Sequence, residues 1–104
     1  MVFIETSVFT REIRTLLPDE DYRRLQAALI YRPGAGNLIP GGGGLRKIRW
    51  GMRGMGKRGA LRIIYHWDVP DTIYMLLPYS KSDQDNLTQE QRKFLRNMVK
   101  EWLA

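Results

Sequence analysis

Three cationic side chains at alternating positions carry the clearest chemical signal in this sequence. In the segment LRKIRW at 45–50, Lys47 and Arg49 are two residues apart, so an extended chain points both to one face and their apolar neighbours to the other. Arg62 alternates in the same way with apolar residues in the segment 60–67. If these two strands pair, three cations gather on one sheet face and repel one another unless an anion lies among them. The pattern predicts a phosphate site, or alternatively an exposed face neutralised by acidic side chains from elsewhere.

Other candidate residues follow the last predicted strand or lie close to its partners. Tyr79 and Lys81 stand where that strand ends and can reach the same face, with Lys81 as a further cation. His66 is a candidate general base by residue type, but a single histidine near a strand end is typically structural. Asp83 and Asp85 belong to the approach to the final helix rather than to a pair of catalytic carboxylates.

A basic, glycine-rich segment at 51–59 matches two nucleotide-binding patterns by chance. Its G-x-x-x-x-G-K spacing has Arg58 where a phosphate loop needs Ser or Thr, and the segment that follows is β-branched and aromatic instead of helical. The G-x-G-x-x-G pattern fails for the same missing helix. We expect a loop whose Arg53, Lys57 and Arg58 contact a nucleic-acid backbone, with a simple solvated hairpin tip as the alternative.

The distribution of charge points to a polyanionic partner. The chain has 17 basic and 11 acidic residues, a net charge of +6, and the stretch 22–67 contains ten basic residues and no acid. The remaining residues have a net charge of −4. No basic amphipathic helix accompanies the basic stretch, so nucleic acid is favoured over a membrane surface. The basic residues are Arg23, Arg24, Arg32, Arg46, Lys47, Arg49, Arg53, Lys57, Arg58 and Arg62.

A small sheet must hold these residues in place. Strands are predicted at 2–5, 45–50, 60–67 and 72–78, and the short joints between the last three indicate an antiparallel meander. The segment 34–44, with six glycines, is predicted to be a loop that Leu38 and Ile39 fasten to the body.

Three helices complete the prediction. The first begins at Thr6 or Ser7 and ends at Pro18, and the second is capped by the acidic residues 19–21. A capping box at 88–91 opens the C-terminal helix. The order β-α-α-β-β-β-α describes a single α+β domain over residues 1–104. The expected buried stripes are Phe9, Ile13, Leu16 and Leu17 in the first helix, Tyr22, Leu25, Leu29 and Ile30 in the second, and Phe94, Leu95, Met98, Val99, Trp102 and Leu103 in the third.

Composition excludes several classes of site. At 104 residues with 43% hydrophobic content, the chain is long enough for one domain with a real core. It has no cysteine and one histidine, so disulfides, thiolate zinc sites, cysteine nucleophiles and multi-histidine metal sites are excluded. We expect neither a metal nor another cofactor. The N-terminus has no secretory pattern and no apolar run approaches membrane-spanning length, so a cytoplasmic protein is expected.

Three segments resemble the HigB-like branch of the RelE/ParE toxin superfamily. They are GGLRKIRW at 43–50, GKRGALRIIY at 56–65 and YSKSDQDNLTQEQ at 79–91, and the similarity covers nearly the whole chain. The resemblance implies a RelE-like fold and the toxin of a bacterial toxin-antitoxin pair. It further implies an endoribonuclease that cuts messenger RNA in the ribosomal decoding site and a cognate antitoxin, expected to be a small helix-turn-helix protein.

The resemblance also implies roles for individual residues. Lys47 and Arg49 on the second strand, Arg62 on the third and Lys81 after the fourth match the basic residues that members use. Better-studied relatives place a tyrosine in the C-terminal helix, whereas this chain has none from residue 89 onward. Either Tyr79 substitutes for it or the chemistry proceeds without an aromatic hydroxyl. Lys47 is the candidate base or proton shuttle.

Two other functions remain open at this point. One, from the same superfamily, is a non-enzymatic poison of DNA gyrase, as in ParE-like toxins. The other is a basic nucleic-acid-binding module without toxicity. The presence of Lys47, Arg49 and Arg62 together favours the nuclease, because gyrase poisons tend to lack that full set.

Overall fold

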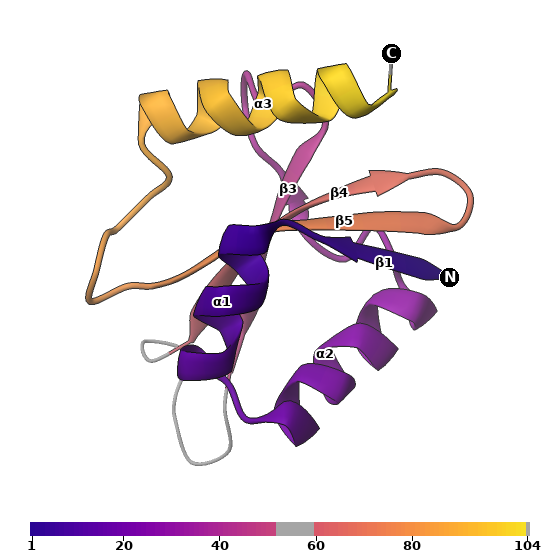
Figure 1. The fold of residues 1–104 in the computed structure, drawn as a ribbon, viewed down its shortest axis with the longest axis vertical. Helices are drawn as coiled ribbons and strands as arrows, with labels where there is room; N and C mark the ends of the chain where they lie inside the picture. The colour runs from indigo at the N-terminus through magenta and orange to yellow at the C-terminus, as the bar shows by residue number, and fades with distance from the viewer. Residues whose placement is uncertain (52–59, 104) are drawn as a thin grey trace.

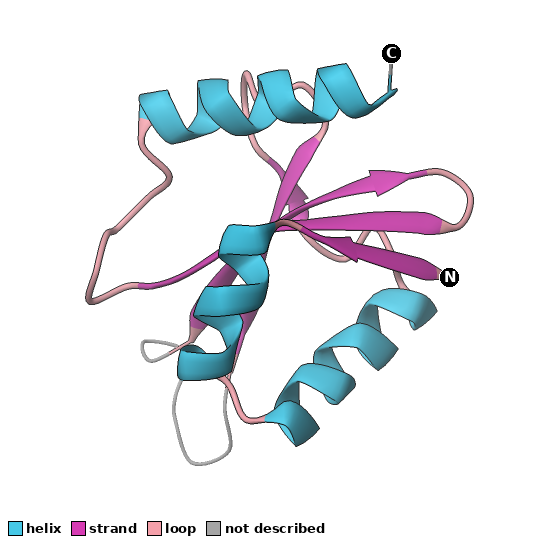
Figure 2. Cartoon of the chain, viewed as in Figure 1, coloured by secondary structure: helices cyan, strands magenta, loops and turns pink. Residues whose placement is uncertain are grey.

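The computed structural model describes residues 1–51 and 60–103. Over these residues the chain forms a five-stranded sheet and three helices (Figures 1 and 2). The strand order across the sheet is β1-β5-β4-β3-β2. The elements in chain order are β1 (Val2–Glu5), α1 (Ser7–Leu16), α2 (Asp19–Tyr31), β2 (Asn37–Leu38), β3 (Leu45–Trp50), β4 (Leu61–Asp68), β5 (Thr72–Ser80) and α3 (Gln89–Leu103).

The sheet is antiparallel from β2 to β5 and gains β1 as a parallel edge strand. This confirms the α+β class and the antiparallel meander of β3, β4 and β5. The element order needs one correction, because Asn37 and Leu38 pair with β3 as a short strand inside the segment predicted to be a loop. Of the two residues expected to fasten that segment, Ile39 packs against the core, whereas Leu38 is exposed.

Helices α1 and α2 cover one face of the sheet, below it in Figure 1. Thr6 caps α1 by accepting a hydrogen bond from the Phe9 amide, as its position predicts. The Glu5 carboxylate joins the layers, since it accepts hydrogen bonds from Thr10 (2.6 Å) and Tyr22 (2.5 Å). Ten buried side chains fill this core: Phe9, Ile13, Leu17, Leu25, Leu29, Leu61, Ile63, Tyr65, Ile73 and Met75.

Helix α3 packs on the opposite face and lies above the sheet in Figure 1. The predicted capping box is present, because Thr88 and Gln91 exchange side-chain to backbone hydrogen bonds of 3.0 Å. Only Leu95 and Val99 of the predicted stripe are fully buried, whereas Phe94 is 64% exposed. The buried residues of this second core are Leu45, Ile64, Leu76, Tyr79, Leu95 and Val99.

Two details of α2 differ from prediction. Its N-cap is Pro18, which makes no side-chain hydrogen bond, and the acidic residues 19–21 form the first turn instead of the cap. They still lie where the positive end of the helix dipole favours them. Ile30 was expected in the buried stripe, but it is exposed; α2 contributes Leu25 and Leu29 to the buried core, and Tyr22 packs against that core.

Candidate nucleic-acid site

A row of three polar side chains crosses the centre of the sheet. Arg49 on β3 is the Cα partner of Arg62 on β4, and Arg62 is in turn the partner of Tyr79 on β5. Directly paired residues share a face, so the three side chains lie on the α3 side. Lys47 lies two residues before Arg49 on that same face, opposite Ile64. The predicted gathering of Lys47, Arg49 and Arg62 on one face is therefore confirmed.

A β-bulge brings Tyr79 into this row. Between Ile64 and Tyr65 the register of β4 with β5 shifts by one residue, so Leu77 pairs with Ile64 and Met75 pairs with Tyr65. A one-residue shift moves every following side chain to the other face. Without the bulge, Tyr79 would point into the α1 and α2 core rather than toward Arg62.

Arg62 is buried, with 4% of its surface exposed, although it is a cation. Its Nη1 donates a 2.6 Å hydrogen bond to the Ala60 carbonyl. Among the described residues the ion pairs are Arg11 with Glu12 and Arg24 with Asp21, so none involves Lys47, Arg49 or Arg62. The segment 52–59 contains no acidic residue. The alternative of a face neutralised by protein carboxylates therefore has no support in the described part of the chain, and the excess positive charge suits an external anion.

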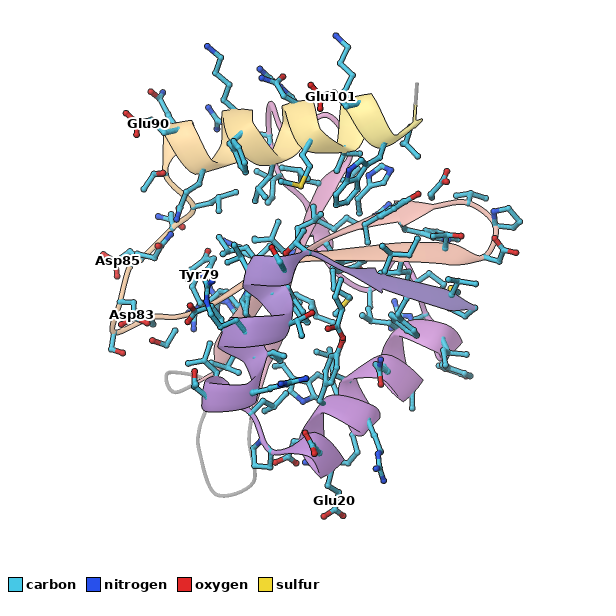
Figure 3. All side chains as sticks on the ribbon, in the orientation of Figure 1. Glu20, Tyr79, Asp83, Asp85, Glu90 and Glu101 are labelled. Atoms are coloured by element: carbon cyan, nitrogen blue, oxygen red, sulfur yellow. The ribbon has the colours of Figure 1, made fainter. Side chains whose placement is uncertain are left out.

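The Tyr79 hydroxyl is buried beside these cations and has no hydrogen-bond partner in the described part of the chain. Burial raises the pKa of Tyr79, while Arg62, the Leu87 backbone and Arg49 act in the opposite direction. The Leu87 backbone lies close enough to the Tyr79 hydroxyl to lower its pKa, but the two groups do not meet hydrogen-bond geometry. The net effect keeps the phenol protonated at neutral pH and leaves it as a donor without an acceptor. Tyr79 lies where β5 leads into the loop that carries Asp83 and Asp85, whereas Glu90 and Glu101 lie on the outer side of α3 (Figure 3).

A comparison with known protein families covers almost the whole chain. The model of the RelE toxin of the RelE / RelB toxin-antitoxin system matches residues 3–104. The chain belongs to the RelE toxin family. Membership implies a cognate antitoxin as partner. The fold of this RelE-family chain, with its mixed five-stranded sheet and three helices in the described residues, is compatible with a RelE-like fold.

The other predicted site residues of this RelE-family chain lie outside the row of Arg49, Arg62 and Tyr79 or outside the described residues. Lys81 is exposed immediately after β5, and among the described residues it takes part in no ion pair. Arg46 pairs with Tyr65 on the opposite face, where its guanidinium donates to the carbonyls of Gly34 (3.3 Å) and Gly36 (2.8 Å). Arg53, Lys57 and Arg58 lie outside the described residues.

His66 serves the fold at the far end of β4. Its Nδ1 lies 3.2 Å from the Gly44 carbonyl oxygen, and its ring lies near that of Tyr74. Gly44 has a positive φ of 101°, and a Cβ there would come within 2.9 Å of the imidazole. The structural role expected for a single histidine agrees with this placement.

A pocket of about 360 Å³ lies beside the row of Arg49, Arg62 and Tyr79 and shares Lys47 with that face. This pocket was not predicted from the sequence. It contains Lys47 together with Asn37, Asn86 and Arg92, which come from three separate segments. Arg92 follows the capping box, so the sequence indicated its helix but not its neighbours. Among residues 1–51 and 60–103 no cluster of three potential metal ligands occurs, and no helix there is long and apolar enough to cross a membrane.

Proposed function

We propose that this toxin is a ribosome-dependent endoribonuclease of the HigB-like branch that cuts messenger RNA in the decoding site and so inhibits translation. Toxins of the RelE family are generally endoribonucleases. The observation that carries the proposal is the row Arg49, Arg62 and Tyr79, with Lys47 beside it. It gathers fixed cations on one face with a phenol that has no hydrogen-bond partner among residues 1–51 and 60–103.

The chemistry follows from where charge develops during RNA cleavage. The 2′-hydroxyl attacks the adjacent phosphorus, a proton leaves that hydroxyl, and the bond from phosphorus to the 5′-oxygen breaks. A cyclic phosphate remains on one fragment, and the departing 5′-oxygen takes up a proton. Negative charge concentrates on the non-bridging oxygens in the transition state, so cations already fixed around the phosphate stabilise it more than they stabilise the ground state.

Each residue has a role in this scheme. Arg49 and Arg62 hold the scissile phosphate, and the buried Arg62 is preorganised for bidentate contact. Tyr79 donates its unpartnered hydroxyl to a phosphate oxygen, in place of the tyrosine that relatives carry in the last helix. Lys47 takes the proton from the 2′-hydroxyl or shuttles it, and Lys81 protonates the leaving oxygen or holds the next phosphate.

Other parts of the surface contribute to binding. Arg53, Lys57 and Arg58 supply further contacts to messenger RNA or the ribosome, and Arg46 adds charge from the opposite face. A cognate antitoxin of the helix-turn-helix class neutralises the toxin. Co-expression with the neighbouring reading frame is expected to yield a complex that survives purification, and failure to recover one would count against this partner.

The decisive experiment follows messenger RNA in a purified translation system with and without ribosomes. We expect the wild type to cut only translated RNA, and a Lys47→Ala, Arg49→Ala, Arg62→Ala variant to lose at least about 1,000-fold in rate, since one stabilising donor alone is worth about 100- to 1,000-fold. A variant with alanine at Arg11, Arg14 and Arg23, exposed residues of α1 and α2, removes the same charge and is expected to retain activity.

Intact RNA in that experiment, combined with DNA integrity and growth of expressing cells and with the stability of the variant, distinguishes the alternatives to the nuclease. Intact RNA with double-strand DNA breaks in expressing cells would indicate a ParE-like gyrase poison. Intact RNA without DNA damage or growth arrest would indicate a basic binding module. A large loss of stability in the triple variant of Lys47, Arg49 and Arg62 would show that these cations support the fold instead of a ligand.

A further inference from the structure

The pocket of about 360 Å³ beside the row of Arg49, Arg62 and Tyr79 is lined by three parts of the chain. Lys47 of β3 connects it to the row, and Leu87 lies both in the pocket wall and beside the core that contains Tyr79. Asn37 of β2 is the Cα partner of Lys47, so the amide and the ammonium side chains lie on the same face. The pocket is therefore a continuation of the proposed phosphate site toward β2 and the start of α3.

Hydrogen bonds fix the polar groups around this pocket. The guanidinium of Arg92 donates to the Pro40 carbonyl at 3.3 Å, and the Arg92 amide donates to Thr88 at 2.9 Å in the first turn of α3. The Gln84 amide group donates to the Asn86 carbonyl (2.9 Å) and to the Gln91 side chain (2.8 Å). These bonds hold the segment with Asn86 against the capped end of the helix.

The composition of the pocket suits one nucleotide. Two cations, Lys47 and Arg92, suit a phosphate, and none of the pocket-lining residues is acidic. The side-chain amides of Asn37 and Asn86 each offer two donors and an acceptor, which are the groups that read the edges of an unstacked base. The aliphatic surface of Leu87 and of the segment 38–40 suits the face of that base. A volume of about 360 Å³ is within the usual range for small-molecule sites.

We propose that this pocket is a nucleotide subsite that binds the RNA residue next to the scissile phosphate and contributes to the choice of cleavage sequence. The proposal rests on the proposed nuclease function. Lys47 lies at the boundary between the two sites, Arg92 holds the neighbouring phosphate, and the amides of Asn37 and Asn86 contact the base.

The first test observes the asparagine side chains directly. The chain has three asparagines, of which Asn37 and Asn86 line the pocket while Asn97 lies elsewhere on α3. We expect the side-chain amide signals of Asn37 and Asn86 to shift in nuclear magnetic resonance spectra when 2′-O-methyl RNA tetranucleotides, which cannot be cut, are added to the labelled protein. The Asn97 signal is expected to stay in place. An absence of shifts at Asn37 and Asn86 overturns the subsite.

A matched pair of arginine variants gives the second test. Arg92 and Arg96 are one helical turn apart on α3, and each donates to a backbone carbonyl of the segment 34–44, Pro40 for Arg92 and Gly41 for Arg96. We expect Arg92→Gln to weaken binding of the same tetranucleotides by about tenfold, the value of one charged hydrogen bond, and Arg96→Gln to change it less than about twofold. Equal losses in both variants overturn the subsite, because general charge would then account for binding.

Cleavage mapping separates this proposal from the function on which it rests. If the wild type cuts translated RNA, Asn37→Ala and Asn86→Ala are expected to cut at a changed set of sequences. Wild-type cleavage with unchanged positions in both variants overturns the subsite and leaves the nuclease intact. Shifts at Asn37 and Asn86 in a protein that cuts no RNA would keep the binding pocket and reject the nuclease.

Discussion

The two faces of the sheet use similar residues for different purposes. On the α1 and α2 face, Phe9 is fully buried, and the Tyr65 hydroxyl is satisfied by the Gly36 amide (2.8 Å) and the Pro33 carbonyl (2.7 Å). On the α3 face, Phe94 is 64% exposed and the Tyr79 hydroxyl has no partner in the described region. The buried tyrosine hydroxyl is therefore satisfied on one face and unmatched on the other, although the indole N–H of Trp50, which packs against the α1 and α2 core, also has no partner among the described residues.

This difference indicates where stability and function reside. A buried donor without an acceptor and a buried arginine without a carboxylate both cost free energy. Such groups persist where the rest of the fold supplies enough stability to hold them. Here the α1 and α2 core supplies that stability, and the α3 face holds cations without a carboxylate and a phenol without an acceptor among the described residues.

The largest expected effect comes from the two phenylalanines. We expect Phe9→Ala to lower the free energy of unfolding by about 3–5 kcal/mol, because it empties a closed core in which Phe9 lies 5.8 Å from the Tyr22 ring. Phe94→Ala is expected to change it by about 0.5 kcal/mol or less, as for other exposed side chains. Urea unfolding of both variants measures the difference. Equal losses would show that α3 carries as much of the stability as α1 and α2.

The two tyrosines give the second contrast. Tyr65→Phe removes two hydrogen bonds and leaves the Gly36 amide unpaired, so a loss of about 1–3 kcal/mol in unfolding free energy is expected. Tyr79→Phe removes an unpartnered hydroxyl and is expected to leave stability unchanged, while cleavage of translated RNA slows about 100-fold. Undiminished cleavage by Tyr79→Phe would exclude this hydroxyl from the chemistry.

The smallest expected effect on stability at neutral pH comes from the ionisation of the buried tyrosines, which influences the free energy of unfolding only at alkaline pH. Burial raises the pKa of Tyr22, Tyr65 and Tyr79 in the folded protein, and Glu5 raises that of Tyr22 further. Below the ordinary tyrosine pKa of about 10, both states keep the proton, so this contribution is constant. Above it the unfolded chain releases protons first, and stability falls with rising pH.

Unfolding in urea at about pH 8 and about pH 11 checks this expectation. The free energy of unfolding is expected to fall less between these two pH values in Tyr22→Phe than in the wild type. The variant lacks the phenol whose pKa is raised by both burial and Glu5. Lysines titrate equally in both proteins and cancel from the comparison. An identical decline in wild type and Tyr22→Phe would contradict the assignment.

Local sequence patterns alone predicted several elements correctly. Strand β3 has the predicted bounds, and the alternation of cations with Ile48 and Trp50 identified the correct face, because a strand repeats every two residues regardless of its partners. The capping box located the start of α3 because its hydrogen bonds join residues three apart. Burial of Ile30 and Phe94 was wrong, since an apolar stripe does not state how much of it a neighbouring layer covers.

The charge segregation, the helices with local caps and the face shared by Lys47, Arg49 and Arg62 can all be predicted from the sequence. The position of Tyr79 beside Arg62 depends on the tertiary fold. The bulge that places it there falls in MLLP at 75–78, an unbroken apolar run in which no residue reveals which face it takes. The same holds for the pocket, in which Asn37 lies far along the chain from Asn86 and Arg92. Their proximity depends on strand pairing and helix docking, which no local pattern encodes.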